Sequence, residues 1–180
     1  MQPDSHDPLD LFPNWLRSLD ADARVFSRAL CDARLDAEER TYIAGALNYL
    51  LKSVDLIPDG VEDLGFLDDA FILRRTALQV LRQEGGAGAH YPELSKLGSE
   101  ALDVNEFLGT DAERLAEFVS GLRITSVRGR SPSDIVEDEN LARQVADEAA
   151  SWAESYQCPT FLRDEKTLVK LKAFLATKLA

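Results

Sequence analysis

Apolar residues recur at intervals of three and four along almost the whole chain, and no convincing alternation of polar and apolar residues appears. Such spacing places the apolar side chains on one face of an α-helix. The pattern therefore predicts an all-α fold, a compact bundle of about seven helices. Residues 1–13 are predicted to be a flexible N-terminal arm, and Trp15 begins the packed part.

The first half of the chain carries the clearest helix signals. Asp20 is predicted to cap a first helix, and Asp36 a second, with Glu39 as its capping-box partner three residues later. Pro58 disfavours helical geometry at the residue before it, so the second helix should end near residues 53–55.

A helix over about residues 67–84 has apolar residues on two sides, a pattern that indicates a central helix. A glycine-rich linker, residues 85–91, follows it. The linker joins two parts, residues 14–84 and 92–180, of a single helical domain that spans residues 14–180.

The second part is predicted to begin with a helix at Pro92, followed by a helix capped by Thr110 and Glu113, a long helix, and a last helix over about residues 163–179. At a constant offset of 75 residues, eight identities link the segment 36–66 to this part. Two diverged helical repeats are therefore an open alternative to a simple bundle.

The chain carries 20 basic and 32 acidic residues, a formal net charge of −12. An acidic surface repels nucleic acid, so no nucleic-acid partner is expected. The charge is uneven, because residues 161–180 hold a net of +3 and the first 160 residues therefore carry −15. The basic last helix either docks on the acidic body or is a partner-binding tail.

The N-terminus is polar and acidic, unlike a signal peptide, and Cys31 and Cys158 form no CxxC motif. Both features predict a cytoplasmic protein with free thiols. The longest uncharged run near the middle, residues 41–51, is about half of the roughly 20 residues that a membrane span needs. Any membrane contact would therefore be peripheral and not integral.

The most distinctive segment reads Asp55-Leu-Ile-Pro-Asp59, continues through Leu64-Gly65, and ends in Leu67-Asp68-Asp69. Over about residues 47–82 the chain resembles the YkvA-like family, a bacterial domain of unknown function. The family pattern reads roughly Ser-Pro-Ile-Asp-Leu-Ile-Pro-Asp, several residues, then Leu-Gly-Tyr-Leu-Asp-Asp. The matching positions are Ser53, Asp55, Leu56, Ile57, Pro58, Asp59, Leu64, Gly65, Leu67, Asp68 and Asp69.

The resemblance implies a helical hairpin and an association with membranes, and it assigns no reaction. Val54 departs from the usual Pro-Ile step of the family. The residues that carry the resemblance are therefore the candidates for a functional site, and their chemistry has to be argued from the residues themselves.

Most of the acidic residues in this segment have a structural explanation. Asp59 is expected to cap a short turn with Glu62 as its partner, and Gly65 to close that turn in a left-handed conformation. Asp68 is expected to cap the following helix, and Asp69 to favour its first turn.

Asp55 is the exception, because it would stand at the end of a helix, where a negative charge is unfavourable. We expect it to accept hydrogen bonds from the loop or to pair with Arg74 or Arg75, since buried arginines need acidic partners. A metal site is an alternative, because carboxylate oxygens suit Mg²⁺ or Ca²⁺. Its candidate ligands are Asp55, Asp59, Asp63, Asp68 and Asp69.

Three functions stay open from the sequence. The favoured one is a non-enzymatic interaction or adaptor module that binds a partner protein or its own copy, because no catalytic constellation appears and neither His6 nor His90 has a neighbour at ligand spacing. The alternatives are a divalent-metal-dependent enzyme at the segment 55–69 and a peripheral membrane protein. No cofactor is expected apart from Mg²⁺ or Ca²⁺ at that segment.

Overall fold

The computed structural model describes residues 6–52, 55–61 and 63–180, and in these residues the regular elements are helical. The all-α prediction is confirmed. The elements, in order, are α1 (Pro8–Leu30), α2 (Ala37–Leu51), α3 (Leu67–Leu81), α4 (Ala87–His90), α5 (Pro92–Leu108), η1 (Gly109–Asp111), α6 (Ala112–Gly121), η2 (Leu122–Ile124), α7 (Pro132–Glu137), α8 (Glu139–Ser155) and α9 (Glu165–Lys178).

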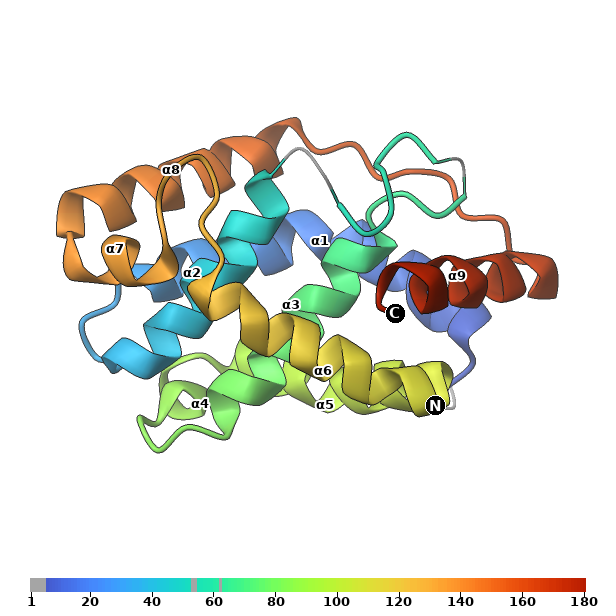
Figure 1. Cartoon of the computed structure of the whole chain (residues 1–180), viewed down its shortest axis with the longest axis horizontal. Coiled ribbons are helices and arrows are strands. Elements are labelled where there is room, and N and C mark those ends of the chain that lie inside the picture. Colours follow the sequence, from blue (N-terminus) through green and yellow to red (C-terminus); the bar gives the residue numbers. More distant parts are fainter. Residues whose placement is uncertain (1–5, 53–54, 62) are drawn as a thin grey trace.

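Helix α3 is the centre of the bundle, as predicted. Every residue from Leu67 to Ala77 is buried, because α1, α2, α5 and α6 all pack against this helix. Figure 1 shows α3 in the middle of the molecule, with α5 and α6 below it and α9 at the right. The charged residues of α3 are consequently buried as well.

The N-terminal segment differs from the predicted arm. Helix α1 already begins at Pro8, with the Asp7 side chain accepting a hydrogen bond from the Leu9 amide. Pro13 lies inside this helix and cannot donate to the Leu9 carbonyl. That carbonyl instead accepts a hydrogen bond of 2.9 Å from Nε of Arg163.

Phe12 is the residue that fixes the start of α1 to the core. It is fully buried, and its ring packs edge-on against Phe71 and Phe107 at centroid distances of 5.1 and 4.9 Å. Because α1 runs on without a break, Asp20 lies inside it and is not the predicted cap. Pro8 and Pro13 disfavour a helix in the sequence pattern, and this is why the early start of α1 was not predicted.

The capping box at the start of α2 is confirmed. The Asp36 side chain accepts from the Glu39 amide at 2.8 Å, and Glu39 accepts from the Asp36 amide at 3.0 Å. Glu39 also accepts a hydrogen bond of 3.0 Å from the amide of Ala87, the first residue of the short helix α4. This bond joins the glycine-rich linker to α2. Helix α2 ends at Leu51, slightly earlier than predicted.

The second half departs from the prediction in two places. Thr110 lies in the turn η1 and α6 has no side-chain cap, so the capping box with Glu113 is wrong. The long helix is divided into α7 and α8 at Asp138, whose side chain caps α8. These elements do not repeat the local structure of α2 and its loop. The fold therefore does not support two repeats related by the 75-residue offset.

The basic last helix packs on the body through apolar contacts. Leu171 and Leu175 are buried, whereas Lys166, Lys170 and Lys178 are exposed. Docking on the body therefore describes α9 better than a free tail does. In the described part of the chain, no helix combines the length and the apolar character that crossing a membrane requires.

Candidate metal centre

The connection between α2 and α3 brings the acidic residues of the sequence motif together. Ile57 and Leu64 are fully buried and anchor this connection in the core. Asp63 and Phe66 adopt positive φ angles of 71° and 69°, which turn the chain sharply into α3. The result is a tight entry that places Asp68 and Asp69 in the first turn of α3, inside the molecule.

Gly65 has a different role from the predicted one. It does not carry the left-handed conformation, which belongs to its neighbours Asp63 and Phe66. A β-carbon on Gly65 would instead collide with the backbone carbonyl of Asp59. Glycine is required here because two backbone segments touch, and this contact holds the Asp59 turn against α3.

Three carboxyl groups converge at this entry. One oxygen each of Asp55, Asp68 and Asp69 lies within 4.8 Å of the other two. Asp68 and Asp69 are 1% and 3% exposed, and Asp55 is half-buried. The structure thus brings together three of the predicted ligands, whereas neither Asp59 nor Asp63 joins the cluster.

Tyr49 holds Asp68 in place. The Tyr49 hydroxyl donates a short hydrogen bond to Oδ2 of Asp68 and accepts one of 2.8 Å from the Leu56 amide. The Ile57 amide donates to the same Oδ2 atom at 3.2 Å. Asp68 therefore fixes the connecting loop and does not cap α3, whose N-cap residue is Phe66 and has no side-chain cap.

The other side of the cluster is left unsatisfied. Oδ1 of Asp55, Asp68 and Asp69 accepts no hydrogen bond from the part of the chain that the structure describes. A buried polar atom without a partner costs about 1–3 kcal/mol, and more when it is charged. Three clustered acids that each keep such an atom therefore make a site that favours a proton or a cation.

The electrostatics of the cluster agree with its burial. Burial, together with the charges of Asp68 and Asp59, raises the pKa of Asp55 to about 7. Burial raises the pKa of Asp68 to about 6, although its hydrogen bonds from Tyr49 and Ile57 act in the opposite direction. Burial and the neighbouring acids raise the pKa of Asp69 well above its usual value.

The arginines of α3 do not neutralise this cluster, contrary to the prediction for Asp55. Arg74 is buried, and its Nε lies 2.9 Å from a carboxylate oxygen of Glu100 and its Nη2 3.4 Å from one of Asp22. Its guanidinium also stacks over the ring of Trp15, 4.3 Å from the ring centroid. Arg74 therefore joins α1, α3 and α5 and has no part in the acidic site.

Arg75 forms no ion pair with the described residues, and its Nε and Nη1 atoms are buried without a hydrogen-bond partner. Lys52 supplies a positive charge that acts on the cluster, because it lowers the pKa of Asp55 and Asp69. Its ammonium group lies over the Tyr49 ring, 4.5 Å from the centroid.

One expected contact of the site involves a residue outside the described part of the chain, and one residue of the site was not predicted. The capping of Asp59 by Glu62 lies outside the described residues. Tyr49 was missed because it reads as one more apolar residue of α2; its only signal was a hydroxyl on a helix face that is otherwise fully buried. Asp59 is exposed, and its charge raises the pKa of all three clustered acids.

A family model described as a protein of unknown function, DUF1232, matches residues 39–73. These residues are therefore similar to DUF1232 and are called the DUF1232 segment below. DUF1232 is the YkvA-like family, so the resemblance drawn from the motif is confirmed. The DUF1232 segment starts at the capping box of α2 and ends inside α3, and it includes Tyr49 and all three clustered acids. No curated protein and no solved structure matches the chain.

Proposed function

We propose that the protein is a divalent-cation-binding module, with Asp55, Asp68 and Asp69 as the carboxylate ligands. The observation that carries the proposal is the convergence of three carboxyl oxygens within 4.8 Å, each acid keeping a buried oxygen without a partner. Oxygen ligands of this kind suit Mg²⁺, Mn²⁺ and Ca²⁺. A bound cation would supply the positive charge that Arg74 and Arg75 do not provide.

The size of the cluster favours the larger cation. Two ligands of one ion can be separated by at most twice the metal–oxygen distance, which is about 4.1 Å for Mg²⁺ and about 4.8 Å for Ca²⁺. An oxygen spread of up to 4.8 Å is within the span of Ca²⁺ and extends beyond that of Mg²⁺. Asp55 is half-buried, so water can complete the coordination from its side.

The cation would act on the fold of the DUF1232 segment. Its ligands come from the loop after α2 and from the first turn of α3, so binding would clamp the connection to the central helix. This role agrees with a non-enzymatic binding module. The membrane alternative needs an exposed apolar hairpin, whereas Leu56, Ile57 and Leu64 are buried.

The test is calorimetric titration of the protein with Ca²⁺, Mg²⁺ and Mn²⁺ after removal of metal by a chelator. We expect Ca²⁺ to bind with one site per chain, and binding to raise the midpoint of thermal unfolding by mass action. In Asp69→Asn the same titration should give no heat. The variant should still fold, because it removes a buried charge and keeps the shape of the side chain.

The matched control is Glu113→Gln, which removes the same charge from an exposed position on α6. It should bind Ca²⁺ as the natural chain does. If the natural chain gives no binding heat with any of the three cations, the proposal is overturned. Equal binding by Asp69→Asn would do so as well, because the heat would then come from other acidic residues.

A further inference from the structure

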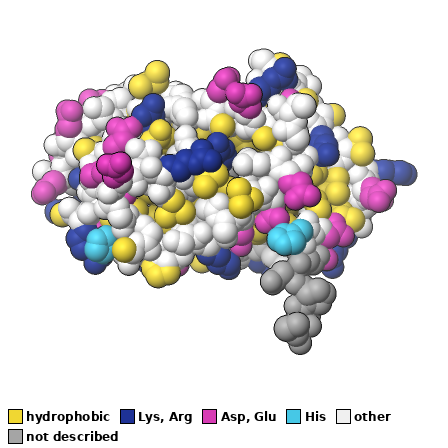
Figure 2. Space-filling view, turned by 90° about the horizontal axis from the view of Figure 1, so that it is seen from below, with side chains coloured by type: hydrophobic (Ala, Val, Ile, Leu, Met, Phe, Trp, Pro, Cys, Tyr) yellow, Lys and Arg dark blue, Asp and Glu magenta, His cyan; other side chains and the backbone are white. Residues whose placement is uncertain are grey.

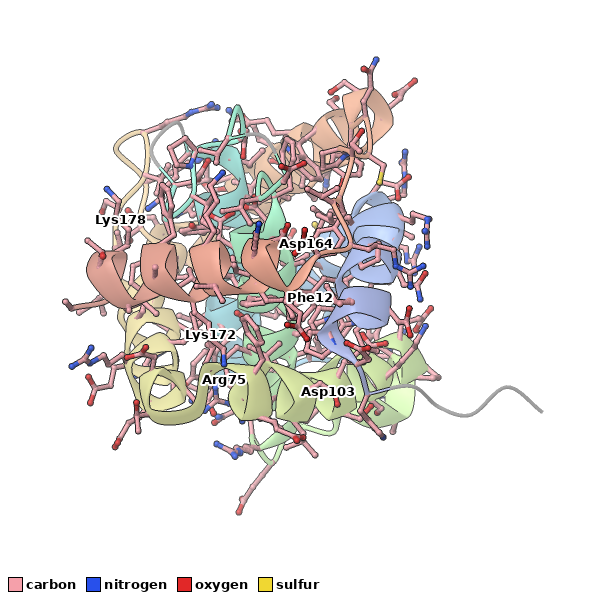
Figure 3. All side chains as sticks on the ribbon, turned by 90° about the vertical axis from the view of Figure 1, so that its right-hand side faces the viewer. Phe12, Arg75, Asp103, Asp164, Lys172 and Lys178 are labelled. Atoms are coloured by element: carbon pink, nitrogen blue, oxygen red, sulfur yellow. The ribbon has the colours of Figure 1, made fainter. Side chains whose placement is uncertain are left out.

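A groove of about 420 Å³ lies between α5 and α9, separate from the acidic cluster. Figure 3 shows this side of the molecule, with Asp103 on α5 and Lys172 on α9. The groove is lined chiefly by Asp103, Glu106 and Phe107 of α5 and by Glu165, Leu168 and Val169 of α9. No element of the described chain occupies it.

The groove has an apolar floor and an exposed apolar edge. Phe107 is buried and Leu168 is half-buried, whereas Val169 is 68% exposed. Leu102 is 60% exposed and lies one helical turn before Glu106, so it extends the apolar edge along α5. Single exposed apolar side chains are ordinary, but a set that borders a groove indicates a contact surface.

The charges around the groove are mostly negative. Asp103, Glu106 and Glu165 line the groove, and His6 Nδ1 at its end lies 2.7 Å from Oδ1 of Asp103. Lys172 is the lysine in the lining, and its ammonium group lies over the Phe107 ring at 4.8 Å from the centroid. The body that carries α5 is itself strongly acidic, with −15 over the first 160 residues. Figure 2 shows acidic side chains next to hydrophobic ones on the right-hand part of the face seen from below. A cationic occupant is therefore favoured over an anionic one.

We propose that this groove binds a basic amphipathic helix of a partner protein. The apolar face of that helix would contact Leu168 and Val169, and its lysines or arginines would pair with Glu106 and Glu165. Recognition of this type places an amphipathic helix in an apolar groove and uses rim charges for selectivity. The proposal does not depend on cation binding at Asp55, because the two sites share no residue.

The test uses a synthetic 18-residue helix of leucine and lysine with a 3.5-residue repeat, and its counterpart in which glutamate replaces lysine. Binding to the full chain is measured by fluorescence anisotropy at low and at high salt. We expect the lysine peptide to bind, the glutamate peptide not to bind, and salt to weaken the interaction. Val169→Ser and Glu106→Lys should each weaken it by about tenfold.

Two matched controls separate the groove from general attraction to an acidic protein. Ile124→Ser removes a side chain that is 85% exposed elsewhere, and Glu113→Lys reverses an exposed acid on α6. Both should leave the affinity unchanged. Equal losses in all four variants would overturn the proposal, and so would equal binding of the two peptides. A dimer in sedimentation analysis that Val169→Ser dissociates would also overturn it, since a second copy would then be the occupant.

Discussion

The backbone carbonyl of Asp59 lies where a β-carbon on Gly65 would have to stand. Since the obstacle is backbone, it cannot rotate away as a side chain can. Gly65→Ala must therefore push the Asp59 turn outward and separate Asp55 from the first turn of α3. We expect a loss of about 1–3 kcal/mol in the free energy of unfolding, measured by urea titration, and a loss of Ca²⁺ binding.

Gly60 provides the control for this substitution in the same loop. A β-carbon on Gly60 meets no atom within 4 Å. Gly60→Ala should therefore change the stability by less than about 0.5 kcal/mol, as surface substitutions usually do. If the two alanine variants are equally stable, the contact between Gly65 and Asp59 does not hold the loop.

Tyr49→Phe tests the hydrogen bonds that support Asp68. The substitution removes the donor to Asp68 and leaves the buried amide of Leu56 without an acceptor. We expect a destabilisation of about 1–3 kcal/mol in thermal or urea unfolding. Tyr42→Phe is the control, since the Tyr42 hydroxyl forms no hydrogen bond with the described residues and its ring packs under Arg123. A smaller effect at Tyr49 than at Tyr42 would contradict the assigned role.

The helical fold could be predicted from the sequence because its signals are local. Apolar spacing and the Asp36–Glu39 capping box depend on residues three or four apart, and both were confirmed. The start of α1 could not be predicted in this way. Pro13 cannot donate to the Leu9 carbonyl, which instead accepts a hydrogen bond from Arg163, 154 residues further along the chain. Only the tertiary structure brings these groups together.

The candidate site could be located from the sequence, but its internal geometry could not. The motif named Asp55, Asp59, Asp63, Asp68 and Asp69, and the structure brings Asp55, Asp68 and Asp69 together. Their separate roles depend on the direction of each side chain at the entry to α3, which is set by the positive φ angles of Asp63 and Phe66. Aspartate is enriched in this conformation but adopts it only occasionally, and bulky phenylalanine rarely adopts it, so neither residue type predicts it.

Arg74 and Arg75 should respond in opposite ways to the same substitution. Arg74→Met leaves Glu100 and Asp22 without their buried cation, and we expect a loss of about 3–5 kcal/mol in the free energy of unfolding. Arg75→Met removes buried donors that have no partner among the described residues, so it should be neutral or stabilising. Urea titration of both variants decides the matter, and a comparable loss at Arg75 would indicate an acidic partner for it.

The stability of the metal-free protein should depend on pH through Asp55. Its pKa is about 7 in the folded protein and about 3.9 in an unfolded chain, so the folded state holds a proton that the unfolded state releases. This contribution is complete below about pH 4 and is lost as the pH rises through about 7.

The measurement compares the natural chain with Asp55→Asn, which keeps a neutral side chain at every pH. In chelator, the two should be about equally stable at pH 5, and the variant should be more stable by about 1 kcal/mol at pH 8, a value that allows for the exposure of Asp55 to water. Saturating Ca²⁺ at pH 8 should reverse the order, because only the natural chain keeps all three carboxylate ligands. If Asp55→Asn loses stability in chelator at pH 8, the charge of Asp55 is already balanced by the protein itself.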